Sequence, residues 1–154
     1  MSYMRRSFLK LVGSVGALAA TGAAGLLRSV EAWADWNKAG FESKVLADAL
    51  KNIGVVSPVE SKDIVITAPD IAENGAVVPV AVTSRIPNTQ QISIVSEKNP
   101  FPLAAMFEIA NGGEGYVSTR IKMGQTSDIW AVVKADGNYF SARKEVKITV
   151  GGCG

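Results

Sequence analysis

The feature that most constrains the fold of this chain is an alternation of apolar and polar side chains that recurs from residue 63 to residue 150. Successive side chains of a β-strand point to opposite faces, so the alternation predicts strands with one buried face. About seven such stretches follow at short, regular intervals: 63–67, 76–84, 91–96, 103–109, 116–123, 128–135 and 139–150. This predicts an all-β chain, an immunoglobulin-like antiparallel β-sandwich, with a small closed barrel as the alternative.

Three short motifs refine this expectation. Asp136-Gly137-Asn138 lies between two apolar runs and predicts a hairpin turn. Gly112-Gly113-Glu114-Gly115 also lies between two strand-like runs, and its spacing is not that of a phosphate-binding loop, so it predicts a turn. Pro79 cannot donate a backbone hydrogen bond, which predicts an edge position or a bulge in its strand.

The sequence before the strands has a helical period. Apolar side chains between residues 35 and 52 recur every three or four positions, which predicts one amphipathic helix: Phe41, Val45, Leu46, Ala49 and Leu50, with Ile53 just beyond. Gly54 is placed to end it. We expect this helix to pack on its own domain; packing on a partner is the alternative.

The first 34 residues resemble an export signal and not part of the fold. Arg5, Arg6 and Lys10 precede an apolar stretch rich in Gly and Ala over residues 11–27, and Ala32-Trp33-Ala34 fits a signal peptidase site. The motif Arg5-Arg6-Ser7-Phe8-Leu9-Lys10 resembles the twin-arginine signal. We therefore expect a periplasmic protein exported by the twin-arginine route. A retained membrane anchor is the alternative, because the apolar stretch is at the lower length limit for crossing a bilayer.

The composition excludes several classes of function. The signal segment holds four of the 16 Lys+Arg and one of the 14 Asp+Glu, so the rest of the chain has a net charge of −1 and suggests no nucleic-acid partner. The chain has no histidine, which excludes Ser-His-Asp and Cys-His catalysis and histidine-ligated metals. One cysteine allows no intramolecular disulfide and no four-cysteine cluster. We expect no cofactor, no metal and no self-contained enzyme chemistry.

The last four residues, Gly151-Gly152-Cys153-Gly154, follow the final predicted strand. Glycine has a wide choice of backbone conformation, so we expect residues 151–154 to form a flexible tail beyond the single domain of residues 35–150, which comprises the helix and the sandwich. Three extended residues give Cys153 a reach of about 10 Å. A thiol at the end of such a tether can enter a narrow pocket of another protein, where bulky neighbours would block entry.

An unpaired cysteine in an exported protein is usually intermolecular or chemically used. Four interpretations of Cys153 remain open. It can be a terminal cysteine with no role, a covalent attachment site, a cysteine that only cross-links copies or other chains in an interaction module, or a catalytic nucleophile. The last is weak, because the chain has no histidine to act as its base.

The sequence resembles the SoxY family, the sulfur-carrier subunits of the periplasmic thiosulfate-oxidising system. The likeness rests on the twin-arginine signal and four segments: Leu46-Ala47-Asp48-Ala49-Leu50, Asn99-Pro100-Phe101-Pro102-Leu103-Ala104-Ala105-Met106-Phe107, the stretch from Arg120-Ile121-Lys122-Met123 to Lys144-Glu145-Val146-Lys147, and Gly151-Gly152-Cys153-Gly154. The family usually has two glycines after the cysteine, where this chain has Gly154 alone.

The resemblance implies a carrier and not an enzyme. Cys153 would be the covalent sulfur attachment site, and Gly151, Gly152 and Gly154 would let it swing. The partner would be a SoxZ-like, immunoglobulin-like subunit in a heterodimer. SoxAX-like, SoxB-like and sulfur dehydrogenase-like enzymes would act in turn on the thiosulfate-derived sulfur that Cys153 holds.

Overall fold

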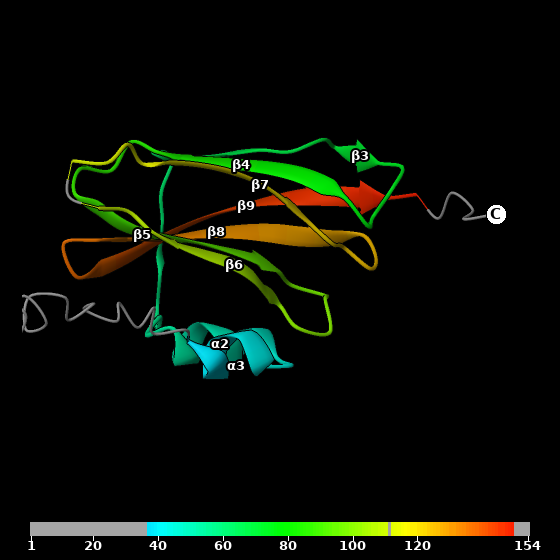
Figure 1. The fold of residues 1–154 in the computed structure, drawn as a ribbon, viewed down its shortest axis with the longest axis horizontal. Helices are drawn as coiled ribbons and strands as arrows, with labels where there is room; N and C mark the ends of the chain where they lie inside the picture. The colour runs from blue at the N-terminus through cyan, green and yellow to red at the C-terminus, as the bar shows by residue number, and fades with distance from the viewer. Residues whose placement is uncertain (1–36, 111, 150–154) are drawn as a thin grey trace, which may run out of the picture. The chain divides into compact units, whose positions relative to one another are not determined.

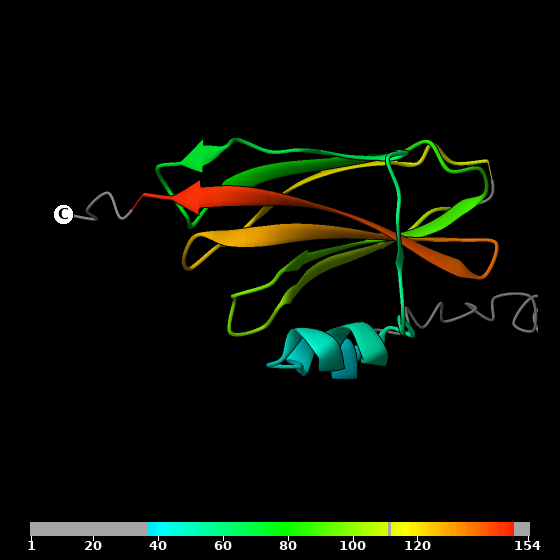
Figure 2. The same ribbon diagram turned by 180° about the vertical axis from the view of Figure 1, so that it is seen from behind.

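The computed structural model describes residues 37–110 and 112–149. These residues form two β-sheets packed face to face, with two short helices against the outer face of the larger sheet (Figures 1 and 2). The larger sheet has the strand order β1 (Val59–Glu60), β9 (Asn138–Ile148), β8 (Ser127–Ala135), β5 (Thr89–Ser96) and β6 (Leu103–Glu108), with β3 (Ile71–Ala72) also paired to β9. The smaller sheet has the order β2 (Ile64–Thr67), β4 (Val78–Ser84) and β7 (Tyr116–Ile121).

The predicted β-sandwich is confirmed, and each of the seven predicted strands is present. The strands form two separate sheets and not the closed barrel that was the alternative. The structure adds β1 and β3, each two residues long, which the sequence analysis missed. Both pair parallel to β9, whereas the seven predicted strands pair antiparallel with one another.

The main core lies between the two sheets and follows the predicted alternation. In β4, Val78, Val80 and Val82 are buried, and the side chains between them point outward. Pro79 lies in the central strand of the smaller sheet, yet its position is locally an edge. β2 pairs with β4 only as far as Ala81, so nothing in that sheet needs a hydrogen bond from the proline nitrogen.

The predicted single helix is two helices, α2 (Lys38–Glu42) and α3 (Leu46–Asn52). The helical path breaks at Ser43, whose backbone is extended and whose hydroxyl donates to the Ala39 carbonyl oxygen at 2.7 Å. This break turns Val45 outward, where the residue is 56% exposed, although the periodicity predicts it on the apolar face.

The helices pack on their own domain, as expected. Ala49, Ile53 and Val55 are buried against Val95 and Leu103 of the larger sheet. This second core fixes the helical segment to the face of the sheet that does not contact β2, β4 and β7 (Figure 1).

Gly54 ends α3 as predicted, with φ at +83°. The Gly54 N–H donates to the Lys51 carbonyl and the Val55 N–H to the Leu50 carbonyl, each at 2.9 Å, which is the Schellman arrangement. The Tyr139 hydroxyl donates to the Ile53 carbonyl at 3.2 Å and so ties the end of the helix to β9.

The predicted hairpin at Asp136 and Gly137 is confirmed. Ala135 and Asn138 pair, which leaves a two-residue loop with φ of 47° at Asp136 and 76° at Gly137. Positive φ at both positions is the geometry of the hairpin turns that match strand twist. This turn sets the register of β8 and β9, and β9 is the strand that leads to the C-terminal segment.

Candidate functional site

The thiol predicted to be functional follows β9 in the sequence. Cys153, Gly151, Gly152 and Gly154 lie outside the described residues, as do Arg5 and Arg6 of the predicted export signal. The structure therefore brings none of these residues together. It does describe the place from which the C-terminal segment departs. We call the last three described residues, Lys147, Ile148 and Thr149, the arm root.

The arm root extends beyond the partner strand of β9. The pairing of β8 with β9 ends where Ser127 faces Val146. The backbone groups of the arm root therefore need other partners, because they have lost those that hold the rest of the strand.

The segment around β3 supplies two of these partners. The Lys147 N–H donates to the Asp70 carbonyl oxygen at 2.9 Å, and the Thr149 N–H donates to the Ala72 carbonyl oxygen at 3.2 Å. Ala72 is itself buried in the main core. One side of the arm root is thus held by a short parallel strand.

The other side of the arm root is held by the β7–β8 turn. The Ile148 N–H donates to the Thr126 hydroxyl oxygen at 3.0 Å. The Met123 N–H donates to the Gly75 carbonyl oxygen at 2.7 Å, which joins that turn to the β3–β4 loop. A Cβ on Gly75 would lie within 3.1 Å of Ile148 Cγ2 and closer still to the Met123 carbonyl oxygen, so only glycine fits there.

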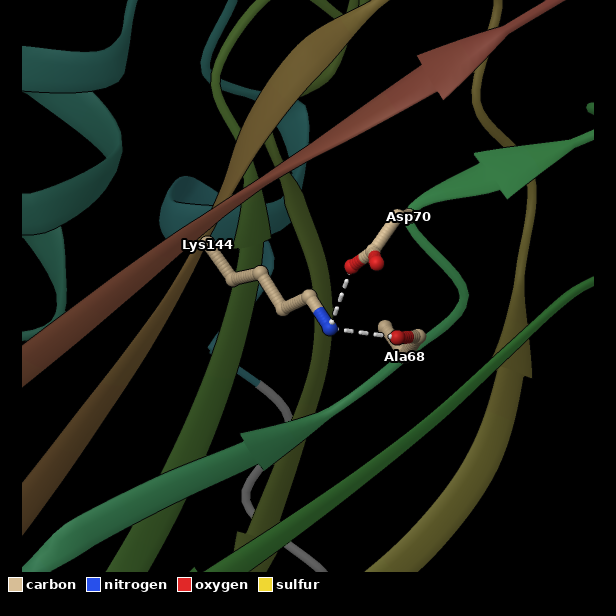
Figure 3. A network of polar contacts seen from close by, with 3 residues as sticks. All are labelled: Ala68, Asp70 and Lys144. Atoms are coloured by element: carbon tan, nitrogen blue, oxygen red, sulfur yellow. Dashed lines mark hydrogen bonds and ion pairs between the residues drawn. The ribbon is translucent and has the colours of Figure 1, made fainter.

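Lys144 fastens the β3 segment to β9 (Figure 3). Its Nζ donates to the Ala68 carbonyl oxygen at 2.6 Å and lies 3.0 Å from Asp70 Oδ1. The Lys144 side chain is 31% exposed, whereas that of Asp70 is 89% exposed. The ammonium therefore holds both a backbone oxygen and a carboxylate of the segment that supports the arm root.

The Asn99-Pro100-Phe101-Pro102 motif forms the β5–β6 loop, at the end of the sandwich where β9 ends (Figure 1). The Asn99 side chain bridges to the β7–β8 turn. Its Nδ2 donates to the Lys122 carbonyl at 2.6 Å, and its Oδ1 accepts from the Gly124 N–H at 3.1 Å. The loop is thereby held against the turn that contacts the arm root.

A hollow of about 430 Å³ lies where this loop meets the turn, lined by Asn99, Pro100, Phe101, Lys122 and Gly124. Phe101 is 50% exposed beside it. In residues 37–110 and 112–149, no cluster of His, Cys, Asp and Glu side chains is suited to a metal ion. The same part of the chain contains no helix that meets the length and apolarity needed to cross a membrane.

Sequence reasoning missed Lys144, Asp70 and Thr126. A signal for Lys144 was present, because it occupies the same phase of β9 as the apolar residues Val146 and Ile148. A charge in phase with a buried face needs a partner. The partner atoms lie 76 residues earlier at Ala68, and no local pattern identifies them.

Comparison with known proteins adds the family. The family model described as sulfur oxidation protein SoxY matches residues 51–153. The solved structure of the sulfur carrier protein SoxY from Chlorobium limicola f thiosulfatophilum is 39% identical, with a TM-score of 0.60, and the alignment covers 68% of this chain and 96% of that one. A superoxide reductase (neelaredoxin) from Ignicoccus hospitalis is 20% identical, with a TM-score of 0.50 over 56% of this chain and 80% of that one, and shares the fold alone.

No curated protein sequence gives a match. The SoxY match extends from within α3 to Cys153, and the described part of that range forms the sandwich whose last strand leads to the cysteine. On this match, and on the 39% identical structure, the chain belongs to the SoxY family of sulfur oxidation proteins.

Proposed function

We propose that this protein is a covalent sulfur carrier in thiosulfate oxidation, with the Cys153 thiol as the attachment site. The observation that carries the proposal is the reach of the family match. It runs to residue 153 and so includes the single cysteine of the chain. The 39% identical protein from Chlorobium limicola is itself a sulfur carrier protein.

The loading step is an oxidation. The Cys153 sulfur bonds to the outer sulfur of thiosulfate, giving Cys–S–S–SO₃⁻, and one proton and two electrons leave. The chain has no histidine, so no histidine base of its own can take the thiol proton. A SoxAX-like haem protein is the proposed electron acceptor, so the carrier supplies the thiol and its position.

The next step is a hydrolysis. Water attacks the sulfonate sulfur of Cys–S–S–SO₃⁻, the S–S bond to that sulfur breaks, and sulfate leaves with two protons. A persulfide, Cys–S–S⁻, remains on the carrier. A SoxB-like hydrolase performs this step in our proposal, and a sulfur dehydrogenase-like enzyme then oxidises the remaining sulfur where the full cycle operates.

The arm root gives this proposal a mechanical basis. All three of its amide groups are hydrogen-bonded, so the chain is held as far as Thr149, one residue beyond β9. Glycines 151, 152 and 154 follow, and glycine has little steric bulk and many allowed conformations. We infer that a small thiol tether on a fixed base lets Cys153 enter the active sites of several enzymes in turn.

The proposal extends to location and assembly. Residues 1–34 act as a twin-arginine signal, and residues 35–154 work in the periplasm beside a SoxZ-like subunit in a heterodimer. Export by this route is compatible with folding before transport, which suits a carrier that leaves with a bound partner.

The test is intact-mass measurement of the protein after incubation with thiosulfate and the partner enzymes. We expect a covalent increase of one thiosulfate-derived group in the wild type and none in Cys153→Ser. The serine side chain is close in size to that of cysteine and has no sulfur, so the fold should be unchanged. A Cys153→Ser protein that still gains the group would refute the proposal.

The same measurement separates the carrier from an interaction module that uses Cys153 for intermolecular disulfides. That alternative predicts that the thiol is consumed in reducible dimers of the chain. The carrier predicts a loaded monomer of this chain, alone or with its smaller partner. Dimers as the sole product of the reaction would favour the alternative.

A further inference from the structure

We propose that Lys144 is a positioning residue that sets the length of the tether carrying Cys153. This inference rests on the proposed carrier function. Lys144 sets the tether length by clamping the segment of residues 68–72 against β9, which keeps the arm root paired. The tether then begins after Thr149 and not several residues earlier.

The edge of β9 that faces away from β8 is covered by two short strands. β1 covers this edge at Phe140 and Ser141, and β3 covers it at Lys147 and Ile148. Between these two contacts the chain leaves the edge and forms β2 in the other sheet. β3 is therefore a separate, two-residue contact, and it needs its own attachment.

Lys144 stands in that interval and provides the attachment. Figure 3 shows its side chain reaching from β9 to the segment that leads into β3, where it meets Ala68 and Asp70. Asp70 is bound twice, since its carboxylate meets Lys144 and its carbonyl accepts from Lys147. A bond between an ammonium and an oxygen is stronger than one between neutral groups.

The consequence for the tether follows from the hydrogen bonds of the arm root. β3 and the residue before it accept two of the three arm-root bonds, and β8 has already ended. If β3 separates from β9, Lys147 and Thr149 lose their bonds, and only the Thr126 hydroxyl and the packing of the Ile148 side chain against the main core still hold the arm root. In the conformations where this remaining hold also opens, the stretch up to Cys153 grows from four residues to seven, which adds about 10 Å of extended reach. The effective concentration of the thiol at a fixed site falls about twofold.

Three variants test the clamp. Lys144→Met removes the ammonium and keeps most of the aliphatic stem. Lys147→Met is the matched control, because it removes the same charge from the same strand nearer the tail. The Lys147 side chain is exposed and has no ion pair among residues 37–110 and 112–149. Lys144→Arg keeps a cation that can donate to both oxygens.

The first readout is amide hydrogen exchange at Lys147 and Thr149. We expect exchange at both to accelerate about tenfold or more in Lys144→Met, whereas in the control, which alters residue 147 itself, exchange at Thr149 stays at the wild-type rate. Lys144→Arg should restore protection. Amides at the centre of β8, such as those of Val132 and Val133, report any general loss of stability. Wild-type protection at Lys147 and Thr149 in Lys144→Met would overturn the proposal.

The second readout is the rate of thiosulfate loading. It distinguishes a role of Lys144 in setting the tether length from a role in stabilising the fold alone. Deleting Gly152 shortens the tether by about 3.5 Å and should slow thiosulfate loading in the reconstituted system. Adding Lys144→Met to the deletion should restore loading, whereas Lys144→Met alone should slow it about twofold. Damage to the fold cannot restore a shortened tether. Failure of the second change to restore loading would also overturn the proposal.

The two readouts keep this inference separate from the proposed function. Hydrogen exchange is measured without thiosulfate or enzymes, so it tests the clamp even if Cys153 carries no sulfur. Loss of the thiosulfate adduct in every variant, including the wild type, would refute the carrier and with it the effect on loading. The exchange result would still decide whether Lys144 holds the arm root.

Discussion

Gly75 offers the sharpest test of how the arm end of the sandwich is packed. Gly75→Ala would place a Cβ 3.1 Å from Ile148 Cγ2 and well inside van der Waals contact with the Met123 carbonyl oxygen. That oxygen belongs to the backbone of a turn and cannot rotate away as a flexible side chain would. The β3–β4 loop must therefore move away from the β7–β8 turn.

The change in the free energy of unfolding caused by Gly75→Ala can be estimated from two destabilising effects and one stabilising effect. Overpacking costs about 1–3 kcal/mol, and loss of the Met123 N–H bond to the Gly75 carbonyl, 2.7 Å long, costs about 1 kcal/mol. Replacing glycine by alanine restricts the unfolded chain and returns about 0.4–1 kcal/mol. We expect the free energy of unfolding to fall by about 2 kcal/mol, a balance of these effects.

Urea unfolding followed by circular dichroism measures this change. Gly124→Ala is the matched control, because a Cβ there would meet no atom within 4 Å and φ at Gly124 is not in the left-handed region. We expect the control to stay within about 0.5–1 kcal/mol of the wild type, with the dependence on urea unchanged in both variants. Equal unfolding midpoints for the two variants would refute the packing described for Gly75.

Substitutions at two further positions test the parts of the fold that position β9. Tyr139→Phe removes the hydroxyl that donates to the Ile53 carbonyl, and we expect a loss of about 1 kcal/mol in urea unfolding; a value indistinguishable from zero would show that this bond does not hold the helix. Gly137→Ala places a Cβ at φ of 76°, and we expect a loss of about 1–2 kcal/mol. Gly137→Asn should cost less, because asparagine tolerates this conformation, and the reverse order would contradict the turn geometry.

The longer strands could be predicted because each contains its own signal. Val78, Val80 and Val82 alternate with outward side chains in a single stretch of β4, and burial follows that alternation. The turn at Asp136 and Gly137 is equally local, since its positive φ angles select the residue types that were found there. Local chemistry decides both features.

The two short strands could not be predicted in this way. Ile71 and Ala72 of β3, like Val59 and Glu60 of β1, are too few residues to show an alternation. They are strands only because β9 lies beside them, and that contact joins distant parts of the sequence.

The helical segment shows a different limit. Its apolar residues have the right period, and the period correctly placed Ala49 in the second core. The break at Ser43 depends on bonds to Ala39 and Asn52, and the latter lies nine residues away. The periodicity of apolar residues assumes one continuous helix and cannot predict such a break. The prediction that Val45 lies on the buried face of the helix is wrong for this reason, since the residue is exposed.

In the candidate site, too, the sequence alone predicts one part, and the other part depends on contacts between distant residues. The sequence predicts Cys153 as the site because it is the single cysteine of the chain, a fact of composition. The groups that fix the strand before it were not visible, because Lys144 meets Ala68 and Asp70 only once the sandwich has formed.

The central claim is that sulfur travels on Cys153. Its most direct test is tandem mass spectrometry of the C-terminal peptide from protein isolated out of cells oxidising thiosulfate, compared with cells grown without it. We predict that the peptide containing Cys153 holds thiosulfonate or persulfide sulfur only in the first sample, and that a reducing agent removes it. An unmodified Cys153 in both samples, with sulfur attached elsewhere on the chain or nowhere, would contradict the account.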